Sequence, residues 1–289
     1  MIINSQKRSF GRGAKVSLFT LGTMRATESL EKMYSIIKNA YYVGINHIET
    51  APSYGDAESL IGNSIKKLAI EENIKEKNWV ITSKVLPKGD FDFLKNNFKK
   101  SLKNLNREKI NNLAIHGLNL KQHLDWVLAG EGKKFISWIL EKELVDQVGF
   151  SSHGSYSLIK DAINCEVFSF CSLHLHYLDQ SKIALAEEAI KKGMGVLAIS
   201  PADKGGRLYS PSDILIEASK PFHPLELAYR FLLAKGITTL SLGATNKKDF
   251  EFAHKLRNSF EKLTKLEKSA LNKIEEVANE RLNSTKCEQ

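Results

Sequence analysis

The chain has 289 residues, of which 42% are hydrophobic, so it can bury a large core as a single domain. Lysine and arginine exceed aspartate and glutamate by 42 to 33, which gives a formal net charge of +9. The basic residues are scattered over polar helical faces without interleaved aromatic residues, which argues against nucleic acid as a partner. No apolar run reaches the roughly 18 residues that a membrane-spanning helix needs, so no membrane partner is expected either.

The three cysteines, Cys165, Cys171 and Cys287, form no CxxC motif and leave an odd number. Such a set does not suit a disulfide framework. We therefore predict a reducing compartment and a cytoplasmic location.

Short apolar segments typical of buried strands alternate with amphipathic segments typical of helices. In chain order, the expected strands span residues 16–22, 46–50, 79–84, 111–116, 146–151, 167–175, 195–200 and 237–243. This alternation indicates repeated βαβ units and a parallel sheet. Eight such units predict one α/β domain over residues 1–289, folded as a (β/α)8 TIM barrel.

The intervening helices are expected at residues 28–43, 57–70, 91–105, 121–143, 155–164, 180–192, 224–235 and 247–257. Gly44, Gly193 and Gly236 stand where three of them should end, as left-handed C-caps do. A further amphipathic helix is expected at residues 261–280, across the outside of the barrel. A loose tail at residues 281–289 would follow it.

Four polar residues stand at or just after the C-terminal ends of predicted strands: Glu49, Tyr54, Lys84 and His116. In a (β/α)8 barrel these positions converge on one mouth, where such folds place their chemistry. An ammonium at Lys84 would lower the pKa of the Tyr54 phenol, and Glu49 would keep that ammonium charged and oriented. His116 is placed to donate a hydrogen bond to a carbonyl oxygen of a substrate. Together these groups predict a proton-donating oxyanion site.

Six motifs extend this pattern along the chain: GINHIETAPSYGDAESLIG at 44–62, ITSKV at 81–85, LAIHG at 113–117, VGFSSH at 148–153, AISP at 198–201 and LGATN at 242–246. In these motifs the chain resembles the aldo-keto reductase superfamily over nearly its whole length. The family's set of Asp, Tyr, Lys and His maps onto Glu49, Tyr54, Lys84 and His116. Glu49 is one methylene longer than the usual aspartate, and we interpret it as a feature of a similar bacterial branch with HIETA and AIHG motifs.

The resemblance implies an NAD(P)H-dependent oxidoreductase that reduces an aldehyde or ketone to an alcohol, with Tyr54 as the proton donor and NADPH or NADH as the cofactor. Ser151 and Ser152 replace the family's Ser-Asn pair that holds the nicotinamide carboxamide, and Ser172 stands where a Gln or Asn contributes. Ile199 takes the place of an aromatic residue that stacks on the nicotinamide ring. Further cofactor contacts are implied at Thr23, Ser200, Lys204, Gly243, Thr245, Asn246 and Lys247.

Residues 243–253 correspond to the family's adenosine-phosphate loop. Asp249 replaces an arginine there, and its carboxylate would repel the 2′-phosphate of NADPH unless Lys247 or Lys248 compensates. The segment DKGGRLY at residues 203–209 offers glycine amides, Lys204 and Arg207 to an anion. A plain glycine turn explains that segment equally well, so both interpretations stay open.

Three histidines have a structural interpretation as well as a functional one. His47 lies two residues before Glu49 on the same strand face, which favours a hydrogen-bonded histidine inside the barrel over a ligand. His174 and His176 alternate like residues on one strand face, as a metal-binding pair would. Because no third ligand stands out in the sequence, we prefer structure or pocket lining and predict no metal.

Two other functions stay open at this point. One is a nucleotide-binding regulatory barrel with little or no turnover, like the potassium-channel beta subunits of the superfamily. The other is a Schiff-base lyase with Lys84 as the nucleophile. The proximity of Tyr54 to Lys84 is better explained by a proton donor than by a lyase. A small-molecule carbonyl substrate is expected, but neither its identity nor the oligomeric state can be read from one sequence.

Overall fold

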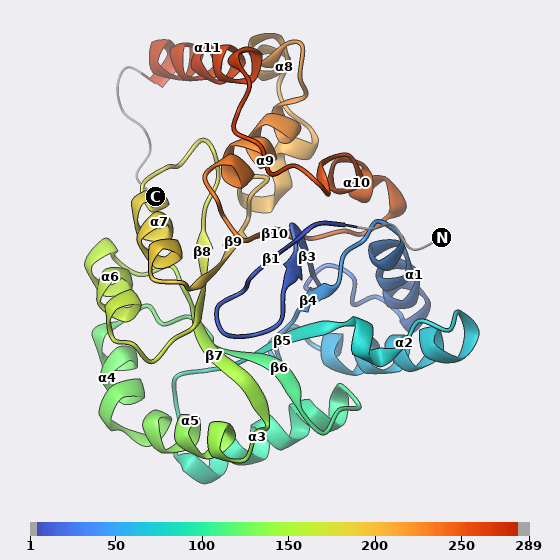
Figure 1. Cartoon of the computed structure of the whole chain (residues 1–289), viewed down its shortest axis with the longest axis vertical. Coiled ribbons are helices and arrows are strands. Elements are labelled where there is room, and N and C mark those ends of the chain that lie inside the picture. The colour runs from blue at the N-terminus through green and yellow to red at the C-terminus, as the bar shows by residue number, and fades with distance from the viewer. Residues whose placement is uncertain (1–4, 283–289) are drawn as a thin grey trace.

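Eight parallel strands close into a barrel at the centre of the molecule (Figure 1), within residues 5–282, the part of the chain that the computed structural model describes. They are β3 (Phe19–Gly22), β4 (His47–Glu49), β5 (Val80–Val85), β6 (Ile110–Ile115), β7 (Val145–Ser152), β8 (Phe170–His174), β9 (Gly195–Ile199) and β10 (Thr239–Leu242). Each strand pairs with the next along the chain, and β10 pairs with β3 to complete the ring. The predicted (β/α)8 barrel is confirmed.

A hairpin that the sequence did not reveal covers the amino-terminal end of the barrel. β1 (Lys7–Arg8) pairs antiparallel with β2 (Val16–Ser17). Between them, Phe10 is fully buried, and its ring centre lies 4.9 Å from that of Phe170, the first residue of β8. The strand predicted at 16–22 is therefore two elements, because β2 belongs to this hairpin and only β3 enters the barrel.

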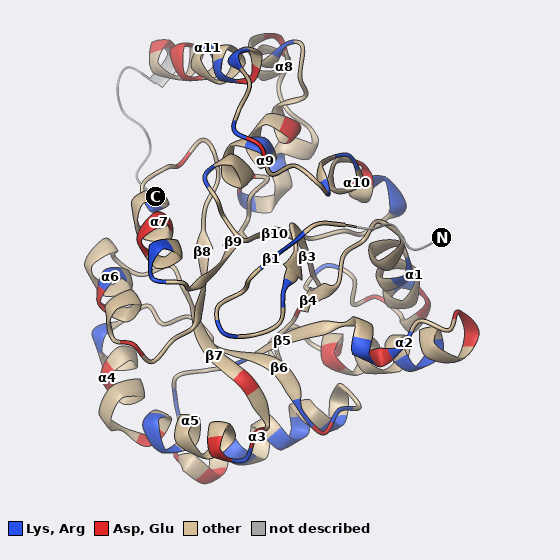
Figure 2. Ribbon diagram, in the orientation of Figure 1, with Lys and Arg blue, Asp and Glu red and all other residues tan. Residues whose placement is uncertain are grey.

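Helices surround the barrel and carry most of the charge (Figure 2). Blue and red segments occur together on most of these helices, in line with the scattered basic residues of the sequence. The helices are α1 (Leu30–Tyr42), α2 (Ala57–Glu71), α3 (Phe91–Asn104), α4 (Lys121–Ala129), α5 (Glu131–Glu141), α6 (Tyr156–Asn164), α7 (Ile183–Lys191), α8 (Asp213–Ser219), α9 (Pro224–Ala234), α10 (Glu251–Leu256) and α11 (Lys265–Leu282), with 3₁₀ turns η1 (Glu76–Asn78), η2 (Lys204–Tyr209) and η3 (Lys247–Phe250). None of the described helices is both long and apolar enough to span a bilayer.

The single helix predicted at residues 121–143 is wrong, because the chain forms α4 and α5 there. Gly130 separates them with an extended backbone, at φ −96° and ψ −156°. Gly132 then packs directly on Trp126, since a Cβ at Gly132 would lie 2.4 Å from the indole ring. A larger residue at position 132 would push α5 away from α4.

Two of the carboxyl-terminal helices, α8 and α11, lie away from the barrel (Figure 1). α8 was not predicted, and α11 packs beside it at one edge of the molecule (Figure 1). α11 begins at Lys265 and not at residue 261, because Thr264 and Glu267 cap it: the Thr264 amide donates to Glu267 Oε2 (2.7 Å) and the Glu267 amide to Thr264 Oγ1 (3.1 Å). Glu267 also forms a buried ion pair with Arg230 of α9 (2.6 Å). Residues 283–289 of the predicted tail, with Cys287, lie outside the described residues.

A layer of hydrogen-bonded polar side chains crosses the barrel interior below the mouth. His47 is fully buried, with Nδ1 2.7 Å from Thr20 Oγ1 and Nε2 2.7 Å from Thr82 Oγ1. Asn112 donates to the same Thr82 hydroxyl (3.0 Å). Burial, with a smaller contribution from the charge of Lys84, lowers the pKa of His47 to about 3. The predicted hydrogen-bonded core histidine is confirmed, and it is neutral at physiological pH.

Candidate active site

A buried ion pair stands at the carboxyl-terminal mouth of the barrel. Glu49 ends β4 and is 4% exposed, and Lys84 lies near the end of β5 and is 2% exposed. The strand register places Glu49 opposite Thr82, two residues before Lys84 on the same strand face. Glu49 Oε1 lies 2.5 Å from Lys84 Nζ. The extra methylene of Glu49 therefore does not prevent the carboxylate from pairing with the lysine.

The Lys84 ammonium has three oxygen partners. Besides contacting Glu49, Nζ donates a hydrogen bond to the backbone oxygen of Thr50 (3.0 Å) and another to Tyr54 Oη (2.9 Å). Nζ also lies 4.6 Å from the centre of the Tyr54 ring. Since an ammonium has three protons, these partners use its full donor capacity and fix it against the phenol.

Tyr54 and His116 complete the cluster at the mouth. Tyr54 lies in the turn after β4, where its amide donates to the Ala51 oxygen (3.0 Å). His116 directly follows β6, and its amide donates to the Val85 oxygen at the end of β5 (2.7 Å). The two rings are perpendicular, with centres 6.0 Å apart. The structure thus brings the four predicted residues together, while their catalytic roles stay predictions.

Burial sets the protonation states in this cluster. Burial and the charge of Glu49 raise the pKa of Tyr54 above its ordinary value, although Lys84 acts in the opposite direction. Lys84 therefore lowers the pKa of Tyr54 as the sequence predicted, but the sequence did not indicate the larger, opposite effect of burying the phenol. Burial, Lys84 and His153 lower the pKa of His116 to about 4. At neutral pH the cluster holds a protonated phenol and a neutral imidazole.

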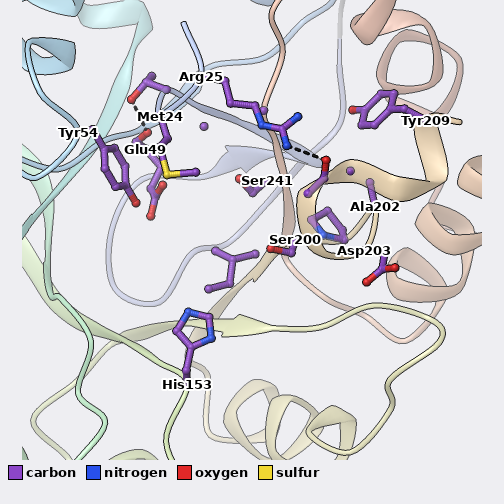
Figure 3. Close-up of a pocket in the computed structure, with 17 residues that line it drawn as sticks. Met24, Arg25, Glu49, Tyr54, His153, Ser200, Ala202, Asp203, Tyr209 and Ser241 are labelled. Carbon is purple, nitrogen blue, oxygen red and sulfur yellow. Dashed lines mark hydrogen bonds between the residues drawn. The ribbon is translucent and has the colours of Figure 1, made fainter. Parts of the chain in front are cut away.

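A cavity of about 330 Å³ opens beside this cluster, with Glu49 and Tyr54 at one side (Figure 3). Thr23, Ser200 and Gly243, three of the predicted cofactor residues, line it. Ile199 also lies in its wall. Thr23 is held in place by its hydroxyl, which donates to the Glu49 backbone oxygen (3.1 Å).

The predicted carboxamide-binding serines lie beside this cavity but not in its lining. The Ser151 hydroxyl accepts from the Gly117 amide (3.0 Å), and the Ser152 hydroxyl donates to the Leu118 oxygen (2.6 Å). Both therefore support the loop after β6. Ser172 differs, because its hydroxyl is fully buried and has no hydrogen-bond partner among the described residues.

The predicted adenosine-phosphate loop is organised around Asp249. Its Oδ2 accepts hydrogen bonds from the amides of Thr245 (2.7 Å) and Asn246 (3.1 Å). Asn246 in turn caps η3 by accepting from the Lys248 amide (2.9 Å). Thr245 and Asn246 thus bind a carboxylate of the chain itself, and neither they nor Lys247 line the cavity. The helix predicted at 247–257 starts as the 3₁₀ turn η3 for the same reason.

The loop after β9 closes the other side of the cavity, which the sequence only partly indicated. Gly205 and Gly206 have φ angles of 72° and 77°, so the glycine pair forms a left-handed turn. Arg25 Nη2 donates to the Gly205 oxygen (2.7 Å), which links this loop to the segment after β3 (Figure 3). Both glycines line the cavity, whereas the exposed Lys204 does not. Asp203, Tyr209, Ser241 and His153 also line the cavity and were not predicted as site residues.

Comparison with known proteins agrees with this architecture. Residues 19–286 match the family model described as the Aldo/keto reductase family. The chain is 29% identical over 216 residues to the aldose reductase of Encephalitozoon cuniculi, covering 69% of each protein. It is 25% identical over 214 residues to aldo-keto reductase str7 of Strobilurus tenacellus, covering 71% of this chain and 61% of that protein.

Solved structures resemble the whole barrel. The holo form of aldo-keto reductase AKR11C1 from Bacillus halodurans superposes with a TM-score of 0.78 at 19% identity, covering 94% of this chain and 96% of that one. The aldose reductase of Schistosoma japonicum gives a TM-score of 0.72 at 19% identity, covering 92% and 91%. At these identities the structures support the fold, and the family model carries the assignment. Because that model spans nearly the whole sequence, the chain belongs to the aldo/keto reductase family and is an oxidoreductase of that family.

Proposed function

We propose that this protein reduces an aldehyde or ketone to an alcohol with NADH or NADPH, and that Tyr54 donates the proton. The observation that carries the proposal is the position of Lys84 Nζ, 2.5 Å from a Glu49 carboxylate oxygen and 2.9 Å from Tyr54 Oη. A charged donor this close to a phenol stabilises the phenolate more than the phenol. The arrangement therefore favours release of a proton from Tyr54 to an acceptor in the cavity.

The protonation states support this direction of transfer. Burial raises the pKa of Tyr54, so the phenol retains its proton at neutral pH until a stronger base forms beside it. An alkoxide forming at the substrate oxygen is such a base. As the proton leaves Oη, the oxygen becomes a phenolate that Lys84 already contacts, and Glu49 keeps the lysine charged. His116, as a neutral imidazole, is suited to donate a hydrogen bond to the same substrate oxygen.

The residues around the cavity fit a dinucleotide cofactor. Thr23, Ser200 and Gly243 line the cavity with polar groups and a small residue. No atom lies within 4 Å of where a Cβ of Gly205 would stand, so the glycine turn leaves space there for an approaching phosphate. When bound, NAD(P)H would supply the hydride that converts the carbonyl carbon to an alcohol. The protein's part is to position the carbonyl oxygen near Tyr54 and His116.

The lyase alternative is disfavoured by the lysine itself. A Schiff-base nucleophile must present a neutral amine, whereas Lys84 is paired with a buried carboxylate and directs its protons at three oxygens. The regulatory alternative predicts no particular lysine–tyrosine geometry, so the assembled cluster favours turnover.

Turnover measurements test the proposal. Purified protein is given NADH or NADPH together with a panel of carbonyl compounds: short aldehydes, aldoses and cyclic ketones. We expect at least one of the two nucleotides to be oxidised when a carbonyl compound is present. The loss of absorbance of the reduced nicotinamide measures this oxidation. Nucleotide binding with no turnover across the panel would favour a regulatory barrel. A borohydride-trapped adduct on Lys84, without nucleotide binding, would favour the lyase.

The position of Asp249 further predicts a preference for NADH. By resemblance, the adenosine ribose lies at this loop. Asp249 places a carboxylate there, and this carboxylate already accepts hydrogen bonds from the amides of Thr245 and Asn246. Asp249→Asn keeps an oxygen acceptor for these amides but removes the charge. We expect the Kd for NADPH to fall about tenfold relative to that for NADH, from the loss of a charge–charge repulsion of roughly 1–2 kcal/mol near the surface.

Fluorescence titration of both nucleotides measures this effect. Asp161→Asn, an exposed charge removal on α6, is the matched control and should change neither Kd. An equal change in both Kd values for Asp249→Asn would indicate loop rearrangement and contradict the assigned charge effect.

A further inference from the structure

Two histidines and an aspartate gather where β8 ends, outside the candidate active site. His174 is the last residue of β8, and His176 lies two residues later, so both side chains project from one face of the extended chain. Their ring centres are 5.1 Å apart. The chain then turns, with the Asp179 amide donating to the His176 oxygen (3.2 Å). This turn supplies the third ligand that the sequence did not reveal, and one ligand atom from each residue lies within 4.8 Å of the others.

The two imidazoles have nitrogen atoms without partners. His174 Nε2 and His176 Nδ1 are buried and form no hydrogen bond within the described part of the chain. Both residues are more than nine-tenths buried, at 7% and 6% exposed. Buried polar atoms in proteins nearly always have a partner, so two unpartnered nitrogens in one cluster indicate a missing ligand. A cation that accepts lone pairs from both would satisfy them together.

The surroundings of His176 and Asp179 also suit a metal. Asp203 Oδ1 lies 3.7 Å from His176 Nε2, on the opposite side of the ring from the unpartnered Nδ1. This distance is within ion-pair range but beyond a hydrogen bond, so the carboxylate would act on the ring by its charge. Asp179 Oδ1 accepts two hydrogen bonds from Ser181, at 3.1 Å and 2.6 Å, which orients the carboxylate.

We propose that His174 Nε2, His176 Nδ1 and the Asp179 carboxylate bind a divalent zinc ion, with a fourth position open to water. Two imidazoles and one carboxylate are a ligand set that zinc accepts. Ligand atoms around tetrahedral zinc lie roughly 3.3 Å apart, so binding would draw the three residues slightly closer. Asp203 also lines the cavity, so the ion would connect the segment after β8 to the loop that closes the site.

Cobalt(II) and zinc binding to the untagged, chelator-treated full chain tests this proposal. We expect one Co²⁺ per chain, with the visible absorption of a tetrahedral site and no thiolate charge-transfer band, and displacement of Co²⁺ by Zn²⁺. His176→Gln should weaken binding at least a hundredfold and Asp179→Asn at least tenfold. His254→Gln, which removes an exposed imidazole of α10, should leave the affinity unchanged.

Asp179 is only half-buried, so the Asp179→Asn variant should fold even if His176→Gln does not, and it can then carry the test alone. Zn²⁺ should also raise the thermal midpoint of the native protein and raise it less in Asp179→Asn, since a ligand that binds only the folded state stabilises it. Absence of saturable binding would overturn the proposal. Binding of equal affinity in native protein and Asp179→Asn would overturn it as well. Neither result depends on carbonyl reduction.

Discussion

Replacing Tyr54 with phenylalanine should lower kcat for carbonyl reduction by roughly 10²- to 10⁴-fold, the range for loss of a positioned general acid. The ring would keep its packing, because the contact with Lys84 at 4.6 Å and the perpendicular contact with His116 involve the ring and not the hydroxyl. Only the transferable proton and the oxygen that Lys84 contacts are removed. The nucleotide Kd should therefore stay within about twofold of the native value, since no lost contact is to the cofactor.

Single-turnover rates and nucleotide titrations measure the two quantities separately. Tyr156→Phe removes a hydroxyl from a half-exposed tyrosine on α6 and serves as the matched control, with native values expected for both. A Tyr54→Phe protein that reduces its best carbonyl substrate at the native rate would remove Tyr54 from the role of proton donor.

The positions of the candidate residues could be predicted because strand ends are local features. NHIET, WVITSK and NNLAIH each show a strand and its end, and a barrel necessarily brings those ends together. Desolvation is not local, and this is why the sequence predicted the effect of Lys84 on the Tyr54 pKa but not the larger, opposite effect of burial. Tyr54 is half-buried at the mouth of a closed barrel, and no spacing in the sequence reports that burial.

The errors in the fold have a similar origin. Gly130 looks like a tolerable interruption within an amphipathic pattern, but its extended backbone separates α4 from α5, and Gly132 then packs on Trp126. The hairpin of β1 and β2 consists of two-residue strands, too short for a periodic pattern. Asp179 escaped notice for a related reason, because its proximity to His176 depends on a turn. In each case the structure depends on a contact that forms after the chain changes direction, and such a contact leaves no periodic pattern in the sequence.

Lys84→Met should cost about 3–5 kcal/mol of unfolding free energy, because it leaves Glu49 as a buried charge without its partner. It should also lower kcat by at least as much as Tyr54→Phe, since the phenolate would form beside an unpaired carboxylate. Urea unfolding measures the first effect. Lys235→Met is the matched control, because the Lys235–Glu187 pair is at the surface, with side chains 40% and 38% exposed, and should contribute less than about 1 kcal/mol.

Combining Lys84→Met with Glu49→Gln separates stability from catalysis. The double variant has no buried charge at the pair, so most of the lost unfolding free energy should return. Its kcat should stay low, because neither methionine nor glutamine provides a positive charge for the Tyr54 phenolate. If the double variant regained both stability and rate, Lys84 would matter only as the partner of Glu49, and the proton-transfer role of the Lys84–Tyr54 contact would have to be abandoned. If the double variant recovered stability but not rate, the 2.9 Å contact between Lys84 Nζ and Tyr54 Oη would be required for catalysis and not only for folding.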